Sequence, residues 1–445
     1  MTEVLAYAAG VLVFVVVIAA SIGLHEIGHM VPAKKFGVRV TQWMIGFGPT
    51  LWSRRVGETE YGIKGIPLGG YIRMIGMFPP APGDAPGTIR ESSTGAFQNL
   101  AEDARRVSAA EMRPGDENRV FYKLSAPKKV VVMLGGPTMN LVIGFVLLGI
   151  MLVGIGLPAA TTTVAEVSEC VVPASSEQTE CGADDPTAPA NEAGVRPGDH
   201  IVSFGGQPTP EWDDVRTAIR ANTGRATSLV VERDGEQLTF EVTPLLTERP
   251  VLDDDDRLVQ RDDGTFVTEE VGFLGVSPTA EMRTQPLTAV PGYVAEQAWA
   301  TAGVIVNLPQ RMIEVGEAAF GDAERDPNGV IGVVGVGRLA GEISSLPQFT
   351  TQDRVASMLA LLGGLNIALF VFNLIPLMPL DGGHVAGALW EGTRRQVAWV
   401  RGRADPGPVD IARLMPLTYA IAVLLIGMSA LLLYADIVRP ISLRG

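Results

Sequence analysis

Four long stretches without a charged residue constrain the fold most strongly. Each exceeds the roughly 20 residues that an α-helix needs to cross the hydrocarbon core of a bilayer. The stretches are Val4–Leu24, Val130–Leu157, Val355–Leu380 and Leu414–Ala435. They predict a polytopic α-helical membrane protein with four transmembrane helices. We place these helices within residues 1–30, 130–157, 351–380 and 411–436.

Two apolar stretches allow a second interpretation. The first stretch could be a signal peptide, but its N-terminal region carries the acidic Glu3 and no Lys or Arg, so a transmembrane helix is preferred. A fifth apolar stretch, Ala298–Gln310, has only 13 residues. We expect it to form an amphipathic or membrane-surface helix, within a connector that covers residues 281–350.

The distribution of charge indicates the orientation. Residues 31–129 contain 15 basic and 9 acidic residues, whereas residues 157–350 contain 12 basic and 32 acidic residues. Basic residues near the ends of spans favour the cytoplasmic side. We therefore expect an extracytoplasmic N-terminus and an extracytoplasmic middle segment, in the plasma (inner) membrane of a cell. The net charge of −14 also argues against a nucleic-acid partner, because such proteins present a basic surface.

The extracytoplasmic residues 158–280 have the pattern of a small α+β domain. A turn at Pro197–Gly198 precedes an alternating strand at His200–Phe204. Helical spacing follows at Trp212–Arg220, and Arg233–Glu236 is typical of a hairpin turn. This segment resembles a bacterial, circularly permuted PDZ domain. The resemblance implies that it binds extended peptides, including peptide C-termini, by strand addition.

Three further features belong to the same segment. Phe273–Val276 is predicted to supply the closing strand of the domain. Asp253–Asp256 and Asp262–Asp263 are interpreted as a solvated insertion, with a calcium site as the alternative, although their spacing is not that of an EF-hand loop. Cys170 and Cys181 both lie outside the cytoplasm, where a disulfide is permitted, and the sequence leaves open whether they form one.

The candidate site of chemistry lies at the end of the first span. Residues His25 to His29 match the pattern H-E-x-x-H. Residues four apart share one face of a helix, so His25 and His29 can both reach one zinc ion. Glu26 lies beside that position and can take a proton from water there. Ionisable residues at the edge of a span are costly unless they serve a function, which favours the metal site over a chance match.

A catalytic zinc site needs a third protein ligand, and the end of the third span offers one. The sequence from Asn373 to His384 reads Asn-Leu-Ile-Pro-Leu-Met-Pro-Leu-Asp-Gly-Gly-His. If this span crosses from outside to inside, Asp381 emerges at the same face as His29. Pro376 and Pro379 break the helix, which is tolerated only in a protein-lined cavity. A turn leaving the membrane would explain the prolines but not the match in depth.

Together these two motifs resemble those of the site-2 protease family of intramembrane zinc metalloproteases. The PDZ-like segment makes the chain most similar to the bacterial RseP-like branch. The resemblance implies one catalytic Zn²⁺ held by His25, His29 and Asp381, with Glu26 as the general base. It also implies that Asn373 helps to hold the substrate or the developing oxyanion.

Three other stretches are similar to features of the family. Residues from about 60 to 75 resemble its membrane-reentrant β-hairpin, which offers a strand edge to an unwound substrate. Gly135–Asn140 resembles its Gly-Pro-x-x-Asn signature, and Gly329–Arg338 resembles a glycine-rich stretch to which we assign no role. The similarity fades in an insertion from about residue 79 to 118, within the loop 31–129. We take four residues as candidate contacts of the substrate: Gly69, Gly70, Tyr71 and Asn140.

The resemblance implies regulated intramembrane proteolysis. The substrates would be single-span membrane proteins, such as anti-sigma factors that a site-1 protease has already trimmed outside. An alternative is a membrane-anchored PDZ scaffold with a vestigial metal site, but a scaffold would have no need of Glu26. A metal transporter would require more polar residues within the spans than this sequence provides.

Overall fold

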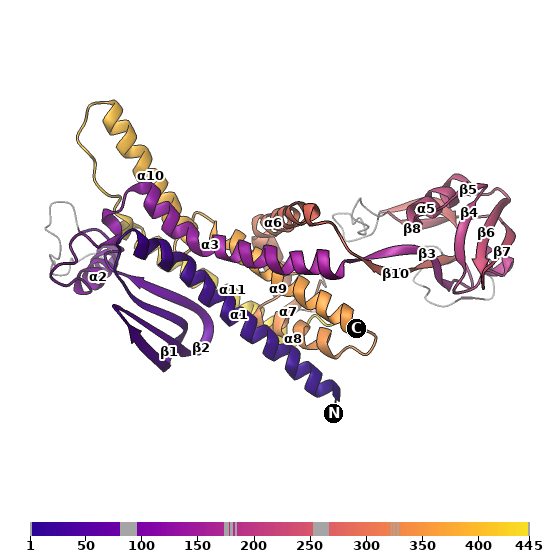
Figure 1. Ribbon diagram of the computed structural model, residues 1–445, viewed down its shortest axis with the longest axis horizontal. Helices are drawn as coiled ribbons and strands as arrows, with labels where there is room; N and C mark the ends of the chain where they lie inside the picture. The colour runs from indigo at the N-terminus through magenta and orange to yellow at the C-terminus, as the bar shows by residue number, and fades with distance from the viewer. Residues whose placement is uncertain are drawn as a thin grey trace. The chain divides into compact units, whose positions relative to one another are not determined.

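The computed structural model separates into two compact units. It describes residues 2–80, 96–172, 178, 181–182, 185–251, 267–321, 323, 325–326 and 329–443. One unit comprises Met1–Ile155 and Gln285–Gly445, and the other comprises Gly156–Thr284 (Figure 1). The predicted solvated insertion at Asp253–Asp256 and Asp262–Asp263 lies outside the described residues, as do residues 81–95 of the insertion in the first loop.

Four helices of the first unit are long and apolar enough to cross a membrane, which confirms the prediction of four such helices. The first is α1 (Thr2–Lys35), and the second is α3 (Ala126–Gly149) continued by the π-helical η2 (Ile150–Ile155). The third is α9 (Thr351–Asn373). The fourth consists of the 3₁₀-helical η4 (Ile411–Leu414) and α11 (Met415–Val438).

The third span is shorter than the segment delimited from the sequence. The helix α9 ends at Asn373, residues 374–380 form turns, and a new helix, α10 (Asp381–Val400), begins at Asp381. The Met378–Pro379 peptide bond within these turns is cis. The helical part of the span thus ends at the first residue of the Asn373–His384 motif, because the prolines that follow cannot continue the helical hydrogen-bond ladder.

Glycines let α1 approach two neighbouring helices closely. A Cβ atom on Gly28 of α1 would overlap the carbonyl of Gly135 of α3, and a Cβ atom on Gly135 would overlap the carbonyl of Gly28. Nearer its N-terminus, α1 packs through Gly10 on Ala340 of α8 (Val333–Ser345). Figure 1 shows α1 and α3 lying side by side. Small residues at such crossings are typical of packed membrane helices.

An antiparallel β-hairpin spans residues 40–74, whereas the sequence predicts a hairpin over about residues 60–75, which hold only its second strand. Its strands are β1 (Val40–Val56) and β2 (Thr59–Met74). Both strands bend, so that Trp43 pairs with Tyr61 on one side and with Ile72 on the other. The hairpin thereby becomes a small sheet, and the end of β2 lies beside α1. Insertion of the hairpin into the membrane stays a prediction.

The fifth apolar stretch forms parts of two helices. The helix α6 (Val290–Val306) ends at Asn307, and α7 (Leu308–Phe320) begins directly after it. A single amphipathic helix over Ala298–Gln310 was expected, and the break at Asn307, followed by Pro309, explains the difference, since proline is tolerated in the first turn of a new helix. The remaining helices of this unit are α2 (Ala96–Ala110) and the 3₁₀ turns η1 (Phe121–Lys123) and η3 (Leu287–Ala289).

The second unit is an α+β structure with its own hydrophobic core. Its main sheet has the strand order β10-β3-β4-β6-β7, with β5 added to β4, and β8 pairs with β9 in a separate two-stranded sheet. The core is built from buried side chains of this sheet and of the helix α5, including Ile201, Phe204, Val215, Leu229 and Val231. The elements are β3 (Leu157–Val167), α4 (Pro189–Ala193), β4 (His200–Phe204), β5 (Gln207–Pro208), α5 (Trp212–Ala221), β6 (Thr227–Arg233), β7 (Glu236–Val242), β8 (Leu245–Pro250), β9 (Thr268–Phe273) and β10 (Val276–Arg283).

Several local predictions can be compared with this unit. The strand at His200–Phe204 is present as β4, and the β6–β7 turn has Asp234 and Gly235 at positive φ, as a tight hairpin turn requires. Phe273–Val276 does not form one closing strand, because it contains the end of β9 and the start of β10, with Gly275 at positive φ between them. Cys170 and Cys181 form a disulfide. The assignment of the unit to the PDZ fold stays a prediction.

Candidate metal centre and active site

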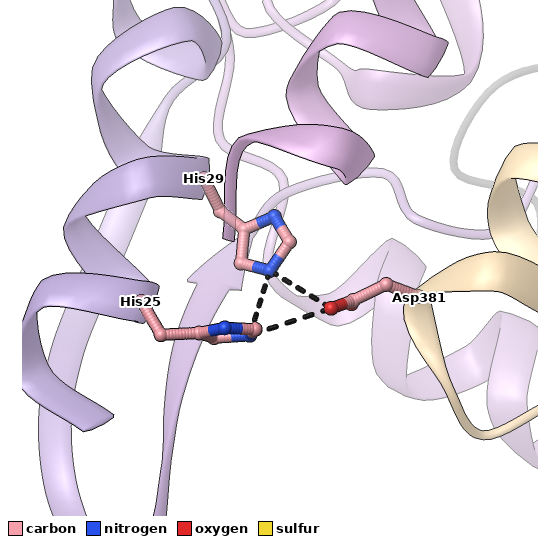
Figure 2. A group of neighbouring side chains, drawn as sticks. All are labelled: His25, His29 and Asp381. Atoms are coloured by element: carbon pink, nitrogen blue, oxygen red, sulfur yellow. Dashed lines mark hydrogen bonds and ion pairs between the residues drawn. The ribbon is translucent and has the colours of Figure 1, made fainter. Parts of the chain in front are cut away.

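Three side chains from two distant parts of the sequence converge at the end of α1. His25 and His29 project from α1, and Asp381 is the first residue of α10 (Figure 2). The two Nε2 atoms lie 3.2 Å apart, and each lies 3.3 Å from Oδ2 of Asp381. Among the described residues, these three form the one group whose ligand atoms could hold a metal ion.

The tautomer of His29 suits a metal ligand. Its Nδ1 donates a hydrogen bond to the carbonyl oxygen of Val132 on α3, at 2.8 Å. A carbonyl oxygen can only accept, so the proton is on Nδ1 and the lone pair of Nε2 faces His25 and Asp381 (Figure 2). A partner on the second ring nitrogen of this kind is typical of histidines that bind metal.

The donor set fits zinc. Two imidazole nitrogens and one carboxylate oxygen are the kind of three-ligand set found in catalytic zinc sites, which keep a further position open. The Nε2 atoms of both histidines and the carboxylate oxygen of Asp381 face one another, with His29 buried and the other two residues partly buried. A cation bound by all three atoms would satisfy the carboxylate oxygen and both imidazole nitrogens at once.

The backbone of α3 leaves room for this cluster. A Cβ atom on Gly136 would overlap the rings of His29 and His25. Gly136, together with Gly135 at the crossing with Gly28, therefore lets the α3 backbone pack directly against the histidine-bearing turn of α1. The requirement for glycine at position 136 was not predicted, although Gly135–Gly136 at the start of the Gly-Pro-x-x-Asn stretch was a visible signal.

Glu26 lies between the cluster and the hairpin. Its side chain is 8% exposed, and its carboxylate accepts a hydrogen bond from the backbone of Ile72 in β2. The neighbouring Gly70 packs so closely that a Cβ atom there would lie 3.2 Å from Cγ of Glu26 and 2.8 Å from Ile22. The carboxylate is thus positioned by α1 on one side and by the end of β2 on the other.

The remaining predicted site residues lie on α3, on α9 and in the hairpin. Asn140 is buried, one helical turn after Gly136, and its Oδ1 has no hydrogen-bond partner within the described part of the chain. Asn373 is the last residue of α9 and is half-buried. Tyr71 stacks on Phe47 within the hairpin, on the face opposite to that of its neighbour Gly70. Gly69, at positive φ, packs against the same Phe47 ring.

A buried ion pair between α3 and α10 has no counterpart among the sequence predictions. Nζ of Lys129, in the first turn of α3, lies 2.7 Å from Oε2 of Glu391 in α10. The backbone N–H of Val409 also donates to Glu391, and Arg395 lies 3.2 Å from its second oxygen. This network fixes the helix that carries Asp381 against the helix that carries Val132.

Comparison with known proteins finds one family match and several relatives that are named as metalloproteases. Residues 13–404 match peptidase family M50. The chain is 32% identical over 444 residues to "Zinc metalloprotease Rip1" of Mycobacterium tuberculosis, covering 98% of this chain and 99% of the relative. It is 33% identical over 452 residues to Rip1 of Mycolicibacterium smegmatis, with 98% of each chain covered. It is 25% identical over 394 residues to "Metalloprotease MmpA" of Caulobacter vibrioides, covering 85% of this chain and 86% of the relative.

Proposed function

The chain belongs to peptidase family M50, and we propose that His25, His29 and Asp381 hold the zinc ion with which it hydrolyses peptide bonds inside the membrane. Membership of this family makes it a zinc metalloprotease with a membrane-embedded site. The observation that carries the assignment of residues is the convergence of the three ligand atoms beside the Glu26 carboxylate.

The roles of the residues follow from their chemistry. A bound zinc ion supplies Lewis-acid catalysis, by activating water as a nucleophile and polarising the scissile carbonyl. Glu26 acts as general base, because its carboxylate lies beside the ligand cluster and can accept the proton of the attacking water. The same carboxylate then returns the proton to the leaving amine. Val132 holds His29 in the required tautomer throughout.

We propose that the end of β2 receives the substrate. A peptide bond within a helix is occupied in its own hydrogen-bond ladder, so the substrate must become extended before attack. Since Gly70 and Ile72 contact Glu26, a strand added to this edge would carry its peptide bonds past the general base. Gly69 and Tyr71 belong to the same proposed substrate-binding hairpin.

Two asparagines complete the proposed site. The buried Oδ1 of Asn140 has no partner among the residues described, which makes it available to a substrate N–H. Asn373 ends the third span a few residues before Asp381, and its carboxamide would hold the substrate or the developing oxyanion.

The proposed partners and orientation follow the charge pattern. Basic residues flank the ends of the spans near the cluster, which supports an active site near the cytoplasmic side of the plasma membrane and a second unit outside. The substrates would be single-span membrane proteins, with anti-sigma factors trimmed by a site-1 protease as the leading class. The second unit would bind extended peptides, including peptide C-termini, as PDZ domains do.

Paired substitutions separate the role of the base from that of the ligands. Glu26→Gln should lower cleavage of a tagged single-span substrate by at least about 100-fold while zinc content is kept. Asp381→Ala should lower both the zinc content and the activity of the purified protein. Glu3→Gln, at the exposed start of the same helix, is the matched control and should change neither. Full activity of Glu26→Gln, or full zinc content of Asp381→Ala, would contradict the assignment.

A further inference from the structure

The second unit contains a groove lined by three arginines. The groove has a volume of about 300 Å³ and lies between α5 and the segment that joins β9 to β10. Its apolar lining includes Trp212 and Ile219 of α5, Phe273 at the end of β9, and Leu274 of the joining segment. The arginines are Arg216 and Arg220 of α5 and Arg249 of β8.

This basic lining contrasts with the charge of the unit that contains it. Residues 156–284 include 25 acidic and 9 basic residues. Three of the nine arginines nevertheless line the one groove, and no Asp or Glu is among its described lining residues. In an acidic unit, such a concentration of positive charge creates a local potential that attracts carboxylates.

The charge of Arg249 is the least compensated of the three. Its guanidinium lies 3.8 Å from the centre of the Phe273 ring, and its Nε is buried with no hydrogen-bond partner in the described ranges. Burial lowers the pKa of Arg249, yet a guanidinium remains charged in a protein. A charged donor that is buried and unpaired is costly, so a ligand carboxylate would relieve a defect that is already present.

The two arginines of α5 can exchange their present partners. Arg216 pairs with Asp213 one turn away, and Arg220 pairs with Glu269 at 3.1 Å. The side chains of Arg216 and Arg220 are 35% and 48% exposed. Ion pairs in such exposed positions are weak, so a bidentate ligand carboxylate can compete for either guanidinium.

A free strand edge continues the groove. β10 stands at one end of the sheet order, paired on one side with β3, and no strand among those described covers its other side. Val276, the first residue of β10, lines the groove. An unpaired edge offers backbone donors and acceptors to an added strand. Pro278 of β10 lacks an N–H, which is tolerated at an edge and restricts pairing to the part nearest the groove.

We propose that this groove binds an extended peptide rich in Asp and Glu, which adds to the edge of β10 and pairs its side-chain carboxylates with Arg216, Arg220 and Arg249. The proposal rests on the proposed peptide binding by the second unit and adds the chemistry that is selected. The protease would thereby favour membrane proteins whose extracytoplasmic part carries an acidic extended segment. Selection by charge would act at a site separate from the metal centre.

Peptide binding to the full-length protein tests this directly. The protein used is the full-length Glu26→Gln variant in detergent micelles, because it should not cleave the probe. The probe is a fluorescein-labelled peptide of about eight residues with alternating Glu and Val. Anisotropy should show that this peptide binds about tenfold more tightly than the same peptide with Gln for Glu. Its affinity should fall as the salt concentration rises from about 50 to about 500 mM.

Arginine variants locate the effect. Arg216→Gln and Arg220→Gln should each weaken binding of the acidic peptide by about threefold to tenfold, and the pair of changes by more. Arg225→Gln is the matched control, because Arg225 is exposed in the same unit but does not line the groove. Arg249→Gln should have a similar effect to the other groove variants, and its thermal unfolding is measured alongside because Arg249 also packs on Phe273.

Four results would overturn the proposal. They are equal binding of the Glu and Gln peptides, unchanged binding after Arg216→Gln and Arg220→Gln, an equal loss with Arg225→Gln, and dependence on a free C-terminal carboxylate alone. The last result is tested with an amidated peptide and would leave general peptide binding intact. None of these outcomes bears on cleavage, which the Glu26→Gln and Asp381→Ala comparison tests independently.

Discussion

Removing the positive charge of Lys129 should destabilise the membrane unit severely. Lys129 Nζ lies 2.7 Å from Glu391 Oε2, and the two side chains are only 6% and 3% exposed. Breaking a buried pair by removing one partner costs about 3–5 kcal/mol, because the other charge stays buried without compensation. Arg395 lies 3.2 Å from the same carboxylate but is one-third exposed, so it offsets the loss only in part. We therefore expect Lys129→Met to lower the free energy of unfolding by about 3 kcal/mol.

The double variant tells whether charge or packing is responsible. In Lys129→Met with Glu391→Met, no uncompensated carboxylate remains, so most of the lost stability should return. Arg395 then keeps Asp405, 3.5 Å away, as its partner. Lys123→Met, at an exposed position of η1, is the control and should change the stability by less than about 0.5 kcal/mol.

Unfolding by denaturant in mixed micelles measures these differences, and zinc content provides a second readout. Because Asp381 begins the helix that Glu391 anchors, Lys129→Met should also weaken zinc binding, and the double variant should restore it. A loss below about 1 kcal/mol in the single variant would refute the reasoning. So would a double variant that is no more stable than the single one.

Two other predictions concern the metal centre and the second unit. Gly136→Ala should abolish zinc binding and cleavage, because its Cβ would overlap the rings of His29 and His25. Gly149→Ala in the same helix is the control: its Cβ meets only an ordinary contact, so zinc binding and cleavage should be unchanged. The zinc content of the two purified variants tests this prediction. Burial alone would raise the pKa of Asp199, but its hydrogen bonds with Arg233 and the Arg196 backbone outweigh this and hold the pKa below its usual value. The resulting stabilisation is complete above the unfolded pKa of about 3.9 and is lost as the pH falls through the folded pKa. Tryptophan fluorescence should therefore report acid unfolding of the second unit in this pH range. The Asp199→Asn variant should no longer show that transition in the same range.

The sequence predicts the spans well because one physical requirement dominates them. A charge-free stretch of about 20 residues has few alternatives to a membrane helix. The ends are harder to predict. At Asn373 the helix stops before Pro376 and Pro379, although the apolar stretch continues to Leu380. Hydropathy therefore delimits what can enter the membrane, while backbone chemistry decides where the helix ends.

The metal cluster could be predicted because its residues are rare in such surroundings. His25, His29 and Asp381 are polar groups at the ends of apolar stretches, and the topology predicted from the charge pattern puts them at the same depth. Their partners gave no comparable signal. The Val132 carbonyl that orients His29 belongs to the backbone, which any residue would supply, and Glu391 lies 262 positions from its partner Lys129. Such contacts depend on helix packing that hydropathy does not encode.

The second unit divides the first in the sequence without dividing its site. Residues 1–155 supply both histidines and Glu26, and residues 285–445 supply Asp381, so the cluster forms only when the two segments pack together. The close approach of Gly28 and Gly135, the opening at Gly136 and the buried pair of Lys129 and Glu391 all lie within the first unit. The geometry of the candidate metal centre therefore depends on contacts within the first unit. The arginines of the proposed peptide groove belong to the second unit, so substituting them replaces none of the residues that form these contacts of the first unit.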